Sequence, residues 1–241
     1  MPVHFSLHGP DLWYATRATG LVAFLLLTVC VVLGLMTVVR YSAPKLPRFV
    51  TVGLHRNTSL LAVVFLALHV LTTVVDTYTS IALSAAFIPF SSDYRTFWLG
   101  LGTVASDLLI ALIVTSLVRL RLGFRSWRMI HWLAYVCWPI ALVHALGTGT
   151  DPATPWMSAI AVLCVVCVVC AIGWRLANGW PARRGLRLGV AAATAAAVLA
   201  VGAWAWSGPL APHWSQRALG ASSAHTALGP RAPGRYTSAG Q

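Results

Sequence analysis

Six apolar blocks, each about twenty residues long, constrain the fold of this chain more than any other feature of its sequence. A helix of about 20 residues spans the hydrocarbon core of a bilayer, which is ~30 Å thick. The composition agrees, because 58% of the residues are hydrophobic and only 9% are charged, whereas a soluble domain has about a quarter of its residues charged. The sequence therefore predicts an all-α integral membrane protein, a bundle of six transmembrane helices.

The predicted spans leave a short segment at each end of the chain outside the bundle. The spans are Arg17–Val39, Leu54–Val75, Phe97–Val118, Met129–Leu146, Trp156–Trp174 and Leu188–Trp206. We expect residues 17–206 to form one membrane domain, preceded by an extracytoplasmic segment of residues 1–16. Residues 207–241 are rich in Gly, Ala, Ser and Pro, which predicts a disordered extracytoplasmic tail. Residues 76–96 form a long, partly apolar connection that we expect to lie over the ends of the helices.

The basic residues lie mainly in three connections on one side of the predicted bundle. These connections follow the first, third and fifth spans, whereas the connections on the other side carry three Asp and a single Arg. The positive-inside rule therefore places the basic connections in the cytoplasm and both termini outside the cell membrane. No nucleic-acid partner is expected, because a basic binding face needs a soluble domain to display it.

Four histidines lie inside the apolar spans, in two pairs. The second span contains His55 and His69, and the fourth contains His131 and His144. The separations of 14 and 13 residues correspond to ~21 and ~20 Å along a helix. Because one span lies between them, the two helices run in the same direction. We therefore expect His55 to lie level with His131, and His69 with His144.

Two levels of paired imidazoles are what two stacked haems need, because a haem iron accepts one neutral imidazole on each side. A zinc site fits less well, since zinc needs four ligands around one point. One detail departs from ideal geometry: at ~100° per residue, 14 residues end about 40° from a whole number of turns, but 13 residues fall about 140° short. We expect Pro139, between His131 and His144, to kink that helix and change its phase.

The stretch Leu122–Gly147, LGFRSWRMIHWLAYVCWPIALVHALG, resembles the haem-binding segment of the ferric-reductase-like transmembrane domain family. The sequence WYATRATG around Arg17 is similar to bacterial members of this family. The family includes the membrane domains of NADPH oxidases and the haem-binding subunit of the bacterial periplasmic methionine-sulfoxide reductase system. The resemblance covers roughly residues 11–206. It implies two b-type haems, one held by the first and third of the four histidines and the other by the second and fourth.

The resemblance also implies electron transfer across the membrane. The donor would be a cytoplasmic flavoprotein or a membrane quinol, and the acceptor outside would be ferric iron, oxygen or a partner redox protein. Because the chain shows no Gly-rich dinucleotide loop after a strand, we expect the haem-carrying membrane subunit of an oxidoreductase, without a flavin or nicotinamide domain of its own. Two alternatives stay open: a transporter that uses the histidines as proton or metal relays, and a haem-bearing anchor for a quinone-linked complex.

Four arginines are candidate partners for the haem propionates. Arg56 and Arg128 lie close in sequence to the histidines expected near the cytoplasmic face, although membrane insertion explains these two equally well. Arg17 and Arg95 flank the outer side of the bundle, where insertion rules disfavour a base. All four are therefore candidate cofactor-binding residues, together with the four histidines that are expected to bind the iron.

Two further features lie inside the predicted spans. Asp107, in the third span, is either a hydrogen-bond acceptor for a ligand histidine or a neutral acid bonded to a neighbouring helix. Cys164, Cys167 and Cys170 form a CxxCxxC run in the fifth span. Buried cysteine behaves as a small hydrophobic residue, so the run indicates core packing and not a metal site.

Overall fold

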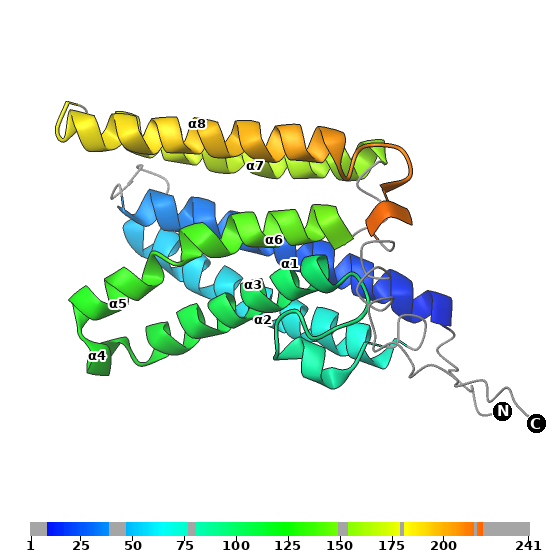
Figure 1. Ribbon diagram of the computed structural model, residues 1–241. Coiled ribbons are helices and arrows are strands. Elements are labelled where there is room, and N and C mark those ends of the chain that lie inside the picture. The colour runs from blue at the N-terminus through cyan, green and yellow to red at the C-terminus, as the bar shows by residue number, and fades with distance from the viewer. Residues whose placement is uncertain are drawn as a thin grey trace, which may run out of the picture.

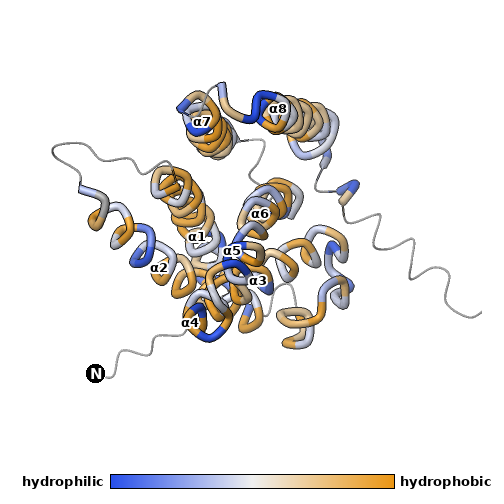
Figure 2. Tube along the Cα trace, turned by 90° about the vertical axis from the view of Figure 1, so that its left-hand side faces the viewer, coloured by the Kyte–Doolittle hydropathy of each residue, from blue (hydrophilic) through white to orange (hydrophobic). Residues whose placement is uncertain are grey.

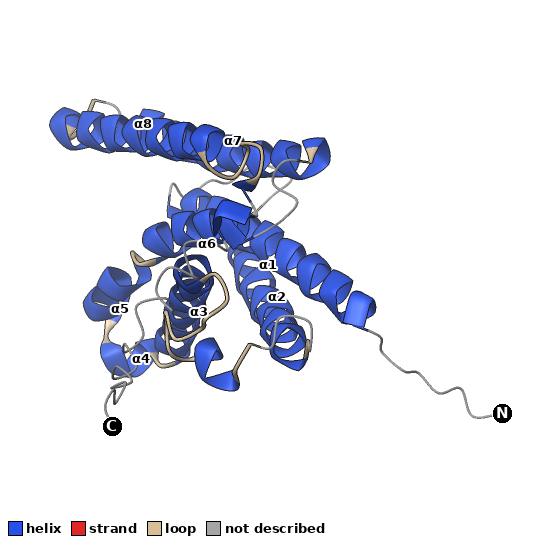
Figure 3. Ribbon diagram, turned by 45° about the vertical axis from the view of Figure 1, so that its right-hand side comes forward, coloured by secondary structure: helices blue, strands red, loops and turns tan. Residues whose placement is uncertain are grey.

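The computed structural model describes residues 9–38, 47–76, 81–148, 154–178, 181–214 and 216–218. Within these ranges the chain is helical and contains no strand (Figure 3), and six segments are long and apolar enough to cross a membrane. The predicted architecture of six membrane-capable helices is therefore confirmed. Large apolar side chains such as Leu117 and Leu199 remain 74% and 73% exposed, as expected for helices whose outer faces contact lipid.

The helices form two unequal groups. Their bounds are α1 (Gly9–Val38), α2 (Arg48–Val75), the 3-10 helix η1 (Leu83–Ala86), α3 (Thr96–Leu117), α4 (Arg119–Leu122), α5 (Phe124–His131), α6 (Ala134–Thr148), α7 (Pro155–Ala177) and α8 (Arg184–Ser207). α1 packs along α2 and against α6 and α7, and α3 packs against α6 and α5. The antiparallel pair α7 and α8 lies alongside the other helices (Figure 1). Seen nearly end-on, the helices carry hydrophobic residues around most of their surfaces (Figure 2).

The core lies between α1, α3, α6 and α7. Its centre is Trp138, whose ring stacks on Phe24 with ring centres 5.9 Å apart. The indole Nε1–H of Trp138 donates to the hydroxyl of Thr28 at 3.0 Å, which satisfies the only polar atom of that buried side chain. Cys164 is buried in the same core, whereas Cys167 and Cys170 are exposed. Core packing therefore accounts for the first cysteine of the CxxCxxC run only.

The fourth membrane span consists of two helices, α5 and α6, joined by a turn at Trp132 and Leu133. Four backbone N–H groups around this turn donate to the carbonyl three residues earlier, those of Trp132, Leu133, Tyr135 and Val136. Such 3-10 bonding rotates each residue by ~120° and advances it by ~2.0 Å, compared with ~100° and ~1.5 Å in an α-helix. The irregular turn lies upstream of Pro139, which stands inside α6.

This turn accounts for the unequal spacing of the two histidine pairs. Five 3-10 steps between His131 and Val136 add about 100° and about 2.5 Å to the path from His131 to His144. Thirteen residues then rotate by about 1400° and rise by about 22 Å, which is close to the 1400° and ~21 Å of 14 α-helical residues. The expectation that Pro139 itself corrects the phase is replaced by this tightened turn.

Segments outside the spans cover one end of the bundle. The hydroxyl of Thr103 on α3 donates to the carbonyl of Ala85 in η1 at 2.7 Å. The ring of Phe90 lies so close to Gly100 that an alanine Cβ there would be 2.2 Å from it. The described part of residues 76–96 therefore packs on α3, as expected, while residues 77–80 lie outside the described ranges.

The segment that follows α8 folds back on the same end of the bundle. Pro209 is buried, and the indole N–H of Trp214 donates to the carbonyl of Gly147 at 3.2 Å. The expected start of a disordered tail at Ser207 is therefore too early for the residues up to Ala218. Residues 1–8, 215 and 219–241 lie outside the described ranges.

Candidate functional site

The four histidines of the spans meet in two pairs, each formed between α2 and the fourth span. The ring centres of His55 and His131 are 6.2 Å apart, and those of His69 and His144 are 6.4 Å apart. The planes within a pair are nearly perpendicular, at 80° and 75°. The structure thus brings together the residues that the sequence placed level with one another.

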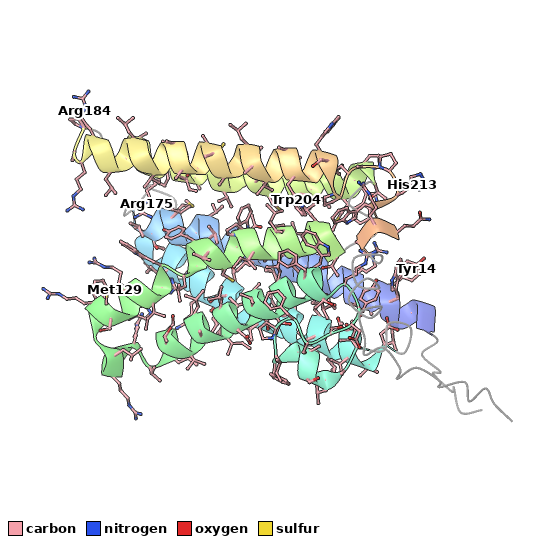
Figure 4. All side chains as sticks on the ribbon, in the orientation of Figure 1. Tyr14, Met129, Arg175, Arg184, Trp204 and His213 are labelled. Atoms are coloured by element: carbon pink, nitrogen blue, oxygen red, sulfur yellow. The ribbon has the colours of Figure 1, made fainter. Side chains whose placement is uncertain are left out.

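The two pairs lie toward opposite ends of the bundle. In Figure 4, Met129, two residues before His131, lies at the same end as Arg184. Tyr14 lies at the other end with His213, and its helix holds His69 through the neighbouring residue Thr16.

The first helix fixes both imidazoles of α2 through its backbone. Nδ1–H of His55 donates to the carbonyl of Cys30 at 3.0 Å, and Nδ1–H of His69 donates to the carbonyl of Thr16 at 2.8 Å. A carbonyl oxygen only accepts, so the proton lies on Nδ1 and the lone pair lies on Nε2. The two acceptors are 14 residues apart on α1, the same separation as the two histidines on α2.

His144 is held in the same way by the third helix. Its Nδ1–H donates to the carbonyl of Trp98 at 2.8 Å, and the hydroxyl of Thr148 lies 3.1 Å from the same nitrogen. This imidazole, like those of α2, therefore keeps an unprotonated Nε2, the form in which histidine binds a metal ion.

A glycine follows each of these three acceptor carbonyls by four residues. An alanine Cβ at Gly20, Gly34 or Gly102 would lie 2.8, 3.4 or 2.4 Å from the nearest atom of the neighbouring imidazole. The carbonyl of a helical residue points toward the residue four positions later, so a missing side chain there lets the ring approach the carbonyl. The sequence reasoning missed these glycines, although Gly20 and Gly34 repeat the 14-residue spacing of the histidines.

His131 is held differently. Its Nδ1 is buried and has no hydrogen-bond partner among the residues that the structure describes. Its ring instead stacks on Trp127, with ring centres 4.9 Å apart and planes at 27°. The indole N–H of Trp127 donates to the hydroxyl of Ser116 at 3.2 Å. Stacking on an anchored indole therefore orients this imidazole.

The four candidate arginines differ in their surroundings. Arg56 and Arg128 are exposed, and Arg128 lies over the ring of Phe124. Arg17 is half-buried and lies over the ring of Trp13 at 4.0 Å. Arg95 is 2% exposed, in contrast to the other three.

The buried guanidinium of Arg95 donates to backbone carbonyls at the end of α6. Its Nη1 lies 2.8 Å from the oxygen of Thr148 and 3.4 Å from that of Gly147. A cation at the C-terminus of a helix binds carbonyls that have no partner within the helix. Arg95 thereby secures the helical turn that carries His144, a role that the sequence did not indicate.

Two other expectations concern metal-binding groups. Asp107 is exposed on α3, and the acceptors found for the three hydrogen-bonded imidazoles are backbone carbonyls and one threonine hydroxyl. Within the described ranges, no group of three or more His, Cys, Asp or Glu side chains is arranged to hold a metal ion. The paired histidines thus offer two protein ligands at each level.

A family model described as the ferric reductase like transmembrane component matches residues 19–142. The match covers half of the chain, from α1 into α6, and includes three of the four paired histidines, with His144 two residues beyond it. No curated protein and no solved structure matches the chain. The matched domain and the six apolar helices identify a multi-pass membrane protein and suggest electron transfer across the membrane. The chain belongs to the family of ferric reductase like transmembrane components.

Proposed function

We propose that the chain transfers electrons across the cell membrane through two b-type haems, one between His55 and His131 and the other between His69 and His144. The observation that carries this proposal is the separation of the rings. A metal ion between two imidazoles needs two bonds of about 2.0 Å, and each ring centre lies about 1.1 Å behind its nitrogen, so the ring centres should be about 6.2 Å apart. The observed separations are 6.2 and 6.4 Å.

The chemistry of the donor set also fits haem. A haem iron takes two axial ligands from the protein and the rest from the porphyrin, and each level offers two imidazoles. The carbonyls of Thr16, Cys30 and Trp98 hold the Nδ1 protons of three of these rings, which directs Nε2 to the iron and raises its basicity. When bound, each haem supplies a one-electron redox centre.

The charged residues support an orientation. Arg56 and Arg128 lie at the His55/His131 end, where the positive-inside rule indicates the cytoplasm. We propose that they bind the propionates of the inner haem and that Arg17 does so for the outer haem, while Arg95 positions the last turn of α6. A cytoplasmic flavoprotein or a quinol would donate electrons at the inner site. Ferric iron, oxygen or a partner redox protein would accept them outside.

Haem content tests the cofactor. The full chain, purified in detergent after expression with ample haem precursor, should contain two haems b per chain by the pyridine haemochrome assay. Its spectrum should be that of low-spin, six-coordinate iron. A chain that folds as a helical bundle but binds no haem would overturn the proposal.

Donor identity is a separate measurement on the same preparation. The oxidised protein is mixed with a short-chain quinol, or with a flavin reductase and its nicotinamide, and haem reduction is followed by absorbance. The donor that reduces the protein at the higher rate distinguishes a quinol-linked subunit from one that is served by a flavoprotein.

A further inference from the structure

Three of the four imidazoles share one local arrangement, and the fourth departs from it. His55, His69 and His144 each donate to a helical carbonyl that is followed four residues later by glycine. His131 has no such acceptor for its buried Nδ1 among the described residues. The two levels are therefore unlike: one has two hydrogen-bonded imidazoles, and the other has one.

The third helix shows why the arrangement is missing at this level. Fourteen residues after Gly102, the helix carries Ser116 in place of a glycine. The hydroxyl of Ser116 donates to the carbonyl of Leu112 at 2.7 Å, so that the carbonyl is already occupied. The same hydroxyl accepts the indole N–H of Trp127 at 3.2 Å, and this indole stacks on His131.

We propose that Trp127, anchored by Ser116, is the positioning residue for His131, and that the His55/His131 site has the higher reduction potential of the two. This inference rests on the proposed binding of two haems. An imidazole whose N–H is bound to a carbonyl is a stronger electron donor and favours the ferric state. The His69/His144 site has two such ligands, and the His55/His131 site has one.

The surrounding charge acts in the same direction. Arg56 directly follows His55, and Arg128 precedes His131 by three residues. Cations near a redox centre favour the state with the lower positive charge, which is the reduced one. The described acidic residues are Asp11, Asp76, Asp93 and Asp107, and none of them lies in the segments that join α2 or α5 to the basic end of the bundle. Ligand bonding and charge thus both raise the potential of the same site.

Redox titration of the purified holoprotein, followed by visible absorbance and electron paramagnetic resonance, tests the order of potentials. The wild-type chain should titrate in two steps. The variant His69→Ala/His144→Ala, which keeps the His55/His131 site alone, should retain the step at higher potential. Retention of the lower step, or two equal potentials in a chain that holds two haems, would overturn this inference and leave the proposed function intact. A wild-type chain without haem would overturn both.

Variants of Trp127 test its positioning role. Trp127→Leu removes the stacked ring and should release haem from the His55/His131 site, or change its resonance signature, while the other site keeps its signal. Trp127→Phe keeps a ring for stacking and should restore the haem that the leucine variant loses. Trp206→Leu, at a tryptophan that is 79% exposed, is the matched control and should retain both signals. Unchanged signals from both sites in Trp127→Leu would contradict the role.

Discussion

His69 on α2 donates its Nδ1 proton to the backbone carbonyl of Thr16 on α1 across 2.8 Å. The contact joins a side chain of one membrane helix to the backbone of another, and His55 repeats it with Cys30 one period of 14 residues away. The first helix is therefore part of the candidate site, although it contributes no ligand to it. The arrangement ties the orientation of two imidazoles to the packing of α1 along α2.

Substitution of the glycines should have graded effects on haem content. Gly102→Ala places a Cβ 2.4 Å from the imidazole of His144 and should displace that ring, with loss of one of the two haems. Gly20→Ala, at 2.8 Å, should weaken binding at the same level, and Gly34→Ala, at 3.4 Å, should have the smallest effect. The measurement is haem per chain after purification.

The control for this series is Gly202→Ala on α8, where no atom lies within 4 Å of the added Cβ. This variant should retain both haems. If Gly102→Ala kept both haems with an unchanged spectrum, the close approach of His144 to α3 would be refuted.

Trp214 should stabilise the helical turn that carries His144. Trp214→Phe removes the N–H that donates to Gly147, a loss of about 1 kcal/mol, which corresponds to about fivefold faster opening of that turn. Hydrogen–deuterium exchange of a peptide that covers the end of α6 measures this directly, with or without haem. Trp206→Phe should leave the exchange rate unchanged. Equal rates in the two variants would mean that the segment after α8 does not secure α6.

Trp138 and Thr28 should contribute to stability as a pair. Trp138→Phe and Thr28→Val each break the hydrogen bond between them and should each cost about 1 kcal/mol. The double variant should cost clearly less than the sum, because the bond can be lost only once. Unfolding in a fixed detergent at matched haem content provides the free energies. Strict additivity would show that the two side chains act independently.

The pairing of the histidines could be predicted from the sequence because it depends on one helix property. Depth along a membrane helix is proportional to residue number, so separations of 14 and 13 residues placed His55 with His131 and His69 with His144. The correction between the two spacings could not be predicted in the same way. It depends on a short run of 3-10 bonding at Trp132 and Leu133, and the only visible helix breaker nearby was Pro139.

The surroundings of the imidazoles were also beyond the sequence argument, for a physical reason. Gly20 and Gly34 acquire their role only when α1 is known to pack along α2, and neither apolar periodicity nor charge specifies that neighbour. Arg95 was a candidate because a base on that side is unusual, but its bonds to α6 depend on the fold of residues 76–96. Trp214 lies in a stretch whose composition favours disorder, and it packs only because other tryptophans are present at that end.

Haem content of paired histidine variants tests the central claim most directly. Removing both partners of one pair, as in His55→Ala/His131→Ala, should leave one haem per chain with the spectrum of the other site. Removing one histidine from each pair, as in His55→Ala/His69→Ala, should leave none. If the variant of one pair lost both haems, or the variant across pairs kept one, the assignment of the four imidazoles to two separate sites would be contradicted.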